Sequence, residues 1–411
     1  MNIWKKYKET SLVLKMTTGF LLGIIVGIIF QDKATILEPF GTIFINLLSL
    51  VAIPVIFLTV VLAVNNMNMK QLGRMGGKLV LYYASTTSAA VLIGVSLALW
   101  INPGENLTLP NVDVETPDTP NFSSVILEMV PKNIIEAFSS GDIIGIMFIA
   151  LIIGLALSTM RFSEHNDIRE QGELLNSFIN AANRMFYKIL QGVLLYAPIG
   201  VFGISATAFG GQGWETFEAL FKFTAVFYVG IFIHWLVVYT SFLKLSGSSV
   251  VQFLRDTKEA ITTALFTSSS IATLPVAINA AKKAGVSDST ANFAIPLGSV
   301  FNADGGALRM GVSIVFAANI TGLDLSIVNL TTIVVIGTVL SIGTAGVPAA
   351  GLVTLTAILT MFGLPLEVVA LIAGVDAIIG MGGTASNVMG DIVGAKVVDR
   401  SESKRASAHS S

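Results

Sequence analysis

Polar side chains recur inside two strongly apolar stretches in the last third of the chain. In the first stretch, Asn302 and Asp304 belong to the run Asn302-Ala303-Asp304-Gly305-Gly306, and Arg309 follows. In the second, a set of residues recurs at spacings of three and four, which places them on one helix face. This set is Asp376, Gly380, Gly383, Asn387 and Asp391. Carboxylate and amide oxygens, with carbonyls freed at a helix break, are the ligands that hard cations prefer. The pattern predicts a cation site between these two stretches.

Several of these polar residues also have simpler interpretations. Asp304 and Arg309 could neutralise each other, and Asp376 could be a structural hydrogen-bonding residue. The run Tyr82-Tyr83-Ala84-Ser85-Thr86-Thr87 is polar for an apolar stretch, but by itself it indicates only hydrogen bonding between helices. His234 is interpreted as a packing residue rather than a proton relay.

The composition indicates what kind of elements position these side chains. Of 411 residues, 53% are hydrophobic and 12% are charged, whereas a soluble domain carries roughly 25% charged residues. The chain is therefore predicted to be a polytopic membrane protein. A net charge of -2 argues against a nucleic-acid binder. The absence of cysteine excludes disulfides and thiolate metal sites, and the three dispersed histidines make no zinc motif.

Six apolar stretches before residue 245 are each long enough to cross a bilayer. They are Ser11–Phe30, Phe40–Val64, Leu79–Ile101, Ile143–Met160, Leu174–Ile204 and Phe221–Leu243. Lysine and arginine gather at the N-terminus, in the turns after the second, fourth and sixth stretches, and near the C-terminus. Because such residues concentrate on the cytoplasmic side, both termini are expected in the cytoplasm, with the protein in the plasma (inner) membrane.

Two later apolar stretches do not fit simple crossings. Ala260–Ala280 is followed by Lys282 and Lys283, and its Ser- and Thr-rich centre, Thr267–Pro275, should break a helix. Leu325–Phe362 contains a second break, Ser341–Pro348. Two re-entrant hairpins would resolve the charge pattern, with Ala291–Ile320 and Val368–Val398 as crossings between and after them. Inverted repeats with interrupted helices are typical of secondary transporters.

This order of elements and motifs resembles the glutamate/dicarboxylate:cation symporter family over nearly the whole chain. The resemblance implies an all-α polytopic membrane protein with eight transmembrane helices plus two re-entrant helical hairpins, and an elevator mechanism in a homotrimer. The resemblance implies that residues 1–78 belong to the scaffold, that 79–102 form the third span, in the transport domain, and that 103–212 contain an external loop and the scaffold spans four and five. Residues 213–245 would form the sixth span, 246–400 the transport core, and 401–411 a disordered tail.

The resemblance also implies sodium and substrate ligands. Sodium would be held by side chains and carbonyls at Tyr83, Thr86, Thr87, Gly298, Val300, Asn302, Ala303, Asp304, Ser341, Ile342, Thr344, Asn387 and Asp391. Substrate would lie among Ser269, Ser270, Arg309, Val347, Gly351, Gly380, Gly383, Thr384 and Asn387.

Departures from the family pattern concern mainly the substrate. Gly380 replaces an aspartate that holds an ammonium group, and Gly383 replaces an arginine that pairs with a distal carboxylate. Ala303 and Gly306 replace a methionine and a threonine, and Arg309 replaces a neutral residue. We therefore expect a symporter, not an enzyme, that couples sodium to a small organic anion or an amino acid, narrowly favouring a dicarboxylate. Protons could replace or accompany sodium. The alternatives are a carrier of a neutral amino acid or monocarboxylate, and an anion channel or uncoupled carrier.

Overall fold

The protein is helical throughout the part of the chain that the structure, a computed structural model, describes: residues 7, 10, 12–65, 69–107, 130–344 and 350–410. The first half contains α2 (Leu12–Phe30), the 3-10 helix η1 (Gln31–Leu37), α3 (Glu38–Asn65), α4 (Met69–Ile101), α6 (Ile134–Ser140), α7 (Ile143–Arg161) and α8 (Asn166–Gln212). The second half contains α9 (Trp214–Ile233), the π-helical turn η2 (His234–Tyr239), α10 (Thr240–Leu245), α11 (Val250–Thr267), α12 (Ser270–Lys283), α13 (Asp288–Phe301), α14 (Asp304–Thr321), α15 (Ile327–Thr344), α16 (Ala350–Met361), α17 (Glu367–Ala373) and α18 (Asp376–Ser410).

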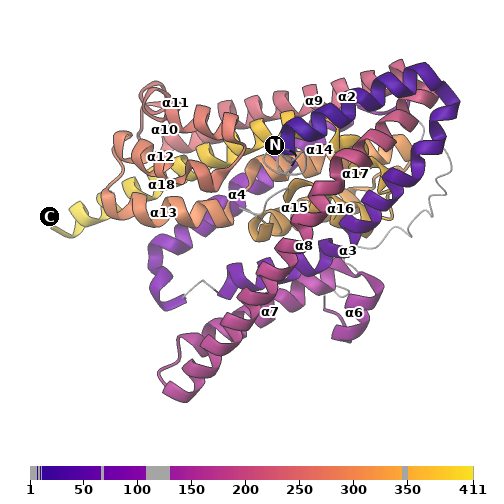
Figure 1. The fold of residues 1–411 in the computed structure, drawn as a ribbon. Helices are drawn as coiled ribbons and strands as arrows, with labels where there is room; N and C mark the ends of the chain where they lie inside the picture. Colours follow the sequence, from indigo (N-terminus) through magenta and orange to yellow (C-terminus); the bar gives the residue numbers. More distant parts are fainter. Residues whose placement is uncertain are drawn as a thin grey trace.

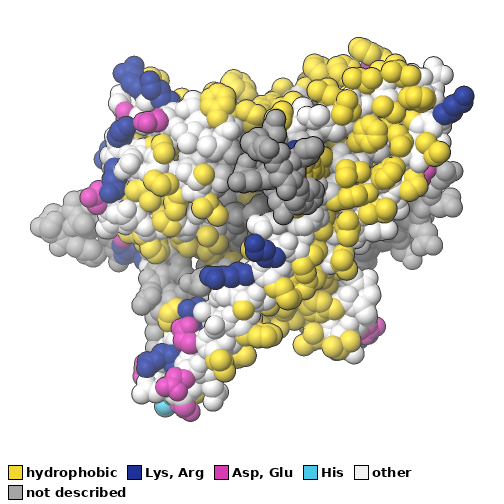
Figure 2. Space-filling model, viewed as in Figure 1, with side chains coloured by type: hydrophobic (Ala, Val, Ile, Leu, Met, Phe, Trp, Pro, Cys, Tyr) yellow, Lys and Arg dark blue, Asp and Glu magenta, His cyan; other side chains and the backbone are white. Residues whose placement is uncertain are grey.

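Length and composition make this a multi-pass membrane protein. Among the described residues, four helical stretches are long and apolar enough to cross a membrane: Leu14–Asn65, Arg74–Ile101, Asn166–Gly211 and Trp214–Leu245. A bent pair, Glu367–Ala373 with Asp376–Ser403, brings the number to five. Leu14–Asn65 has 52 residues, more than twice the roughly 20 that one crossing needs. Figure 2 shows hydrophobic side chains along the long helices of one face, with charged side chains gathered at the turn between α7 and α8 and near α10.

The helices pack in two groups (Figure 1). In one, α8 packs against α2, α3 and α7. Gly19, Gly23 and Gly27 form a stripe at every fourth position of α2, and a Cβ on any of them would overlap the backbone of α8. Small residues at this spacing let two membrane helices approach closely. In the other group, α14 packs against α4, α9 and α18, and α18 also packs against α11, α12 and α13.

The first predicted break in the late apolar stretches coincides with helix ends. α11 stops at Thr267, Ser268 takes a left-handed conformation (φ +48°), and the Ser269 side chain caps α12 by accepting from the Ala272 N–H. α11 and α12 pack against each other, as do α15 and α16. Most of the second break, residues 345–349, lies outside the described residues. How deeply these helix pairs enter a bilayer stays a prediction.

The last predicted crossing is not the single helix that we expected for Val368–Val398. Its two helices, α17 and α18, meet at a bend of 78°. Gly374 lies at this bend, and the Phe20 ring occupies the position that a Cβ on Gly374 would need. Gly374 keeps helical backbone angles (φ −61°, ψ −36°), so this glycine permits the close contact with Phe20 and does not by itself explain the break.

The tail, residues 401–411, was expected to be disordered; the structure continues α18 as a helix to Ser410. Its first turn is tied to α4: Lys78 and Arg74 both pair with Glu402. Continuity with a packed helix, together with these ion pairs, favours the helical backbone.

Candidate cation and substrate site

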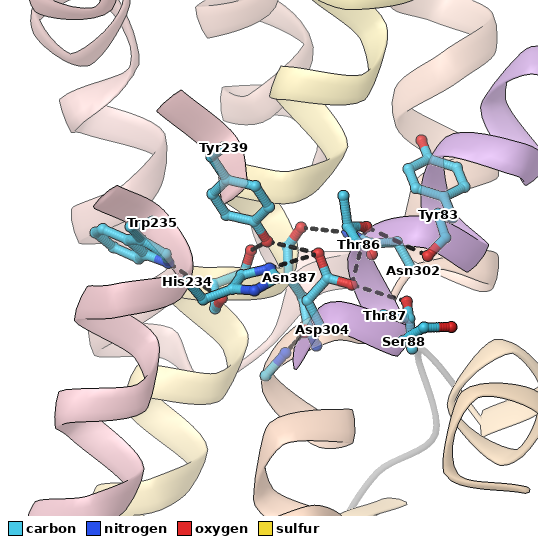
Figure 3. A network of polar contacts seen from close by, with 12 residues as sticks. Tyr83, Thr86, Thr87, Ser88, His234, Trp235, Tyr239, Asn302, Asp304 and Asn387 are labelled. Carbon is cyan, nitrogen blue, oxygen red and sulfur yellow. Dashed lines mark hydrogen bonds and ion pairs between the residues drawn. The ribbon is translucent and has the colours of Figure 1, made fainter. Parts of the chain in front are cut away.

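Asp304 is the centre of a buried polar network at the start of α14. Asn302 and Ala303 are not helical, so the chain is interrupted between α13 and α14 as predicted. The Asp304 side chain is fully buried. Its Oδ1 accepts hydrogen bonds from Thr87 Oγ1 at 2.7 Å and Thr86 Oγ1 at 3.2 Å. Figure 3 shows these hydroxyls converging on the carboxylate from α4. The polar run of the third stretch therefore serves this network and does more than join helices.

Asp391 and Asn302 form the second part of the network. Asn302 Nδ2 donates to the Asn387 carbonyl and to Asp391 Oδ1, both at 3.0 Å. Asn302 Oδ1 is buried and has no hydrogen-bond partner among the described residues. A Cβ on Gly298 would lie within 2.7 Å of the Asp391 carboxyl carbon and 2.6 Å of the Tyr83 hydroxyl. Glycine thus lets the α13 backbone approach this carboxylate.

We call these residues the Asp304–Asp391 cluster: Tyr83, Thr86, Thr87, Gly298, Asn302, Asp304, Asn387 and Asp391. The predicted members of two sodium sites are thus close together in space. Neither Asp304 nor Asp391 has a lysine or arginine ion-pair partner among the described residues. Nor do those residues gather three His, Cys, Asp or Glu side chains as a transition metal would require. Oxygen atoms from carboxylates, amides, hydroxyls and carbonyls instead suit a hard cation.

The third predicted cation site is only partly described. Ser341 is buried, and its Oγ has no partner among the described residues. Val300 and Ala303 lie on either side of Asn302, at the end of α13, which packs against α15. The side chains of Ile342 and Thr344 lie outside the described residues.

The predicted substrate residues come from four elements. Ser269 and Ser270 form the turn between α11 and α12. Gly380, Gly383, Thr384 and Asn387 lie on α18, and Gly351 lies in the first turn of α16. Asn387 Oδ1 accepts from the Gly305 N–H at 2.8 Å, which ties α18 to the interruption before α14. Val347 lies outside the described residues.

Arg309 pairs with Asp376 across α14 and α18, not with Asp304. The suggested neutralisation of Asp304 by Arg309 is therefore wrong. Asp376 has a definite role as the acidic partner of a buried guanidinium. Its place at the first residue of α18, directly after the bend, brings its side chain to α14.

Sequence reasoning missed two residues of the network, His234 and Tyr239. Tyr239 donates to Asp304 Oδ2 at 2.7 Å, and His234 Nε2 lies 3.4 Å from the same oxygen. These residues are five apart, which in a regular α-helix turns their side chains about 140° away from each other. The π-helical turn η2 brings both to Asp304. A histidine and a tyrosine inside one apolar stretch were the available signal. A spacing of five does not place two side chains on the same face of an α-helix, so the pair was not recognised.

α14 approaches α18 closely at Gly305, and only one of the two facing glycines, Gly305 and Gly383, lacks room for a side chain. A Cβ on Gly305 would overlap the Gly383 backbone, whereas a Cβ on Gly383 has no neighbour closer than 3.8 Å. We expect Gly305→Ala to destabilise the protein by about 1–3 kcal/mol, as overpacking does, and to weaken cation binding. Thermal unfolding of purified protein checks this, with Gly383→Ala and Gly380→Ala as matched controls. Equal loss of stability in all three variants would contradict the close approach.

Buried carboxylates beside interrupted helices in a multi-pass helical protein are typical of membrane transporters. The family model of the sodium:dicarboxylate symporter family matches residues 12–401, and the chain belongs to this family. The C4-dicarboxylate transport protein of Bacillus subtilis (strain 168) is 30% identical over 406 residues, covering 96% of this chain and 94% of that protein. The proton/sodium-glutamate symport protein of Bacillus caldotenax is 30% identical over 410 residues, covering 96% and 95%. The C4-dicarboxylate transport protein of Burkholderia ambifaria (strain MC40-6) is 31% identical over 408 residues, covering 96% and 92%. The chain is thus a transporter of the symporter type and not an enzyme.

Proposed function

We propose that this protein couples the entry of sodium to the uptake of a small organic anion, a dicarboxylate, and that the Asp304–Asp391 cluster binds the sodium. The observation that carries the proposal is the pair of buried carboxylates without a lysine or arginine partner among the described residues. Removing two carboxylates from water costs several kcal/mol each unless a counter-charge is present. Two sodium ions would supply this charge, and Asn302 Oδ1 offers a further free ligand.

Sodium fits this cluster better than a proton does. A proton would sit on one carboxylate oxygen and its O–H would engage a single acceptor, whereas the cluster presents carboxylate, amide, hydroxyl and carbonyl oxygens together. A sodium ion accepts these kinds of oxygen at once. The relative from Bacillus caldotenax is named a proton/sodium-glutamate symport protein, so protons remain the alternative that the experiment must separate.

The proposed movement is an elevator motion in a homotrimer. The packing of α8 with α2, α3 and α7 supports their assignment to the scaffold, and the packing of α4, α9, α11–α14 and α18 supports one transport unit. The α15–α16 pair would be the outer gate, with Ser341 in a third sodium site. Both termini would lie in the cytoplasm, at the inner membrane. An anion channel is the competing proposal, and Arg309, the residue on which it depends, is paired with Asp376.

Uptake by purified protein in liposomes tests the coupling. Radiolabelled succinate would be supplied under an inward sodium gradient, an inward proton gradient, or neither. We expect saturable accumulation above the external concentration only with the sodium gradient. Accumulation driven by protons alone would assign the coupling to protons, and flux that only equilibrates succinate would indicate an uncoupled carrier.

A further inference from the structure

Arg309 is a buried arginine that lies beside one of the predicted substrate residues, Gly351. The residue is 6% exposed and lies among apolar residues of α14. Its Nη1 donates to Asp376 Oδ1, so one edge of the guanidinium is neutralised by a carboxylate. The Asp376 side chain is 19% exposed, so the pair is open on the Asp376 side.

The other edge of this guanidinium has no acceptor. Nε and Nη2 are both buried and have no hydrogen-bond partner among the described residues. These two nitrogens share one edge of the planar group, and their N–H bonds are nearly parallel. Two parallel N–H donors are the arrangement that binds a carboxylate bidentately. Asp376 therefore occupies one side of Arg309 and leaves its carboxylate-binding fork free.

Two glycines leave space around the pair. A Cβ on Gly351 would lie 2.8 Å from the guanidinium carbon of Arg309, so the group packs directly on the backbone at the start of α16. Gly380 lies one turn after Asp376 on the same face of α18, and a Cβ there would meet nothing within 4 Å. Neither glycine places a side chain beside the Arg309–Asp376 pair.

We infer that Arg309 is the specificity-determining residue of this transporter. Its Nε–Nη2 edge binds one carboxylate of a dicarboxylate that has no amino group, and Asp376 is a positioning residue that holds the opposite edge. This inference rests on the proposed function and names the substrate contact within it. Because the charge of Asp376 is already balanced by Arg309, this carboxylate attracts a substrate ammonium group less than an unpaired one would.

Binding to purified protein at saturating sodium tests this assignment. The probes are succinate, butyrate (the same chain length with one carboxylate) and aspartate, each measured by thermal shift and by competition. We expect wild type to prefer succinate to butyrate by about tenfold to a hundredfold, as a charge-assisted bidentate pair predicts. Arg309→Lys should lose most of this ratio, and Arg309→Met should abolish it.

Two Asp376 variants separate positioning from mere packing. Asp376→Asn keeps an oxygen that accepts from Nη1, so the succinate preference should persist or increase as a competing negative charge disappears. Asp376→Ala removes the acceptor and should lower the succinate-to-butyrate ratio. Stabilisation by sodium alone, without substrate, should remain in all these variants, because the Asp304–Asp391 cluster is untouched.

Three results would overturn the inference: equal affinity of wild type for succinate and butyrate, a succinate preference retained in Arg309→Met, or aspartate binding tighter than succinate and lost in Asp376→Asn. The last would make Asp376 an ammonium acceptor. If sodium alone did not stabilise the wild-type protein, the proposed function itself would be refuted. If Arg309→Met does not fold, the wild-type ratio and Arg309→Lys decide.

Discussion

Replacing Asp391 by asparagine should abolish sodium-dependent uptake while leaving the protein folded. Asparagine keeps the oxygen that accepts from Asn302 Nδ2, so the contact that joins α18 to the interruption before α14 survives. The negative charge is lost, and with it the main attraction for a buried cation. We expect sodium affinity to fall at least about a hundredfold, which corresponds to about 2.7 kcal/mol. The measurement is the sodium concentration that gives half-maximal succinate uptake in liposomes.

The matched control for this variant is Asp324→Asn. Asp324 is exposed in the turn between α14 and α15, so its replacement makes the same change in net charge outside the cluster. Uptake by this control should match wild type. Normal sodium dependence in Asp391→Asn would remove Asp391 from the cation site.

Asp304→Asn should have a larger effect on folding. The Asp304 carboxylate has Thr86, Thr87 and Tyr239 as donors, and His234 lies within reach. An asparagine amide nitrogen would replace either Oδ1, which accepts from Thr86 and Thr87, or Oδ2, which accepts from Tyr239, and it cannot accept from the donors that it faces. Each buried donor left without an acceptor costs about 1–3 kcal/mol. We expect a lower melting temperature together with loss of sodium coupling.

Thr87→Val provides the comparison for Asp304→Asn. It removes one donor from Oδ1, retains the charge and nearly conserves the side-chain shape. Its melting temperature should fall less, and its uptake should still depend on sodium. If Asp304→Asn were as stable and as sodium-dependent as Thr87→Val, the carboxylate would be a structural acceptor and not a cation ligand.

Much of this arrangement could be predicted from residue types and spacing. The spacings of three and four in α18, the Asn302–Asp304 interruption and the Ser-rich break before Ser270 are local features, and local conformational preferences determine them. Contacts that depend on irregular backbone could not be predicted. The π-helical turn that brings His234 and Tyr239 together departs from the α-helical period. The Phe20 ring that packs against Gly374 at the bend is distant in sequence.

The ion-pair partner of Arg309 also could not be predicted from the sequence. Asp304 is five residues from Arg309 in sequence and was the one partner considered for it, whereas Asp376 is 67 residues away. An ion pair within a membrane protein depends on which helix faces meet, and the bend before α18 decides that here. Pairing Arg309 with Asp376 leaves Asp304 available for a cation.

The binding of sodium without substrate tests the cluster most directly. The melting temperature of purified protein would be measured at increasing sodium, with potassium replacing sodium at constant ionic strength. A ligand that binds only the folded state stabilises it by about 2.7 kcal/mol at a hundred times its dissociation constant. We expect the melting temperature of wild type and Asp324→Asn to rise with sodium, and that of Asp391→Asn to stay constant. An equal rise with potassium, or no rise with either cation in wild type, would contradict sodium binding by the Asp304–Asp391 cluster.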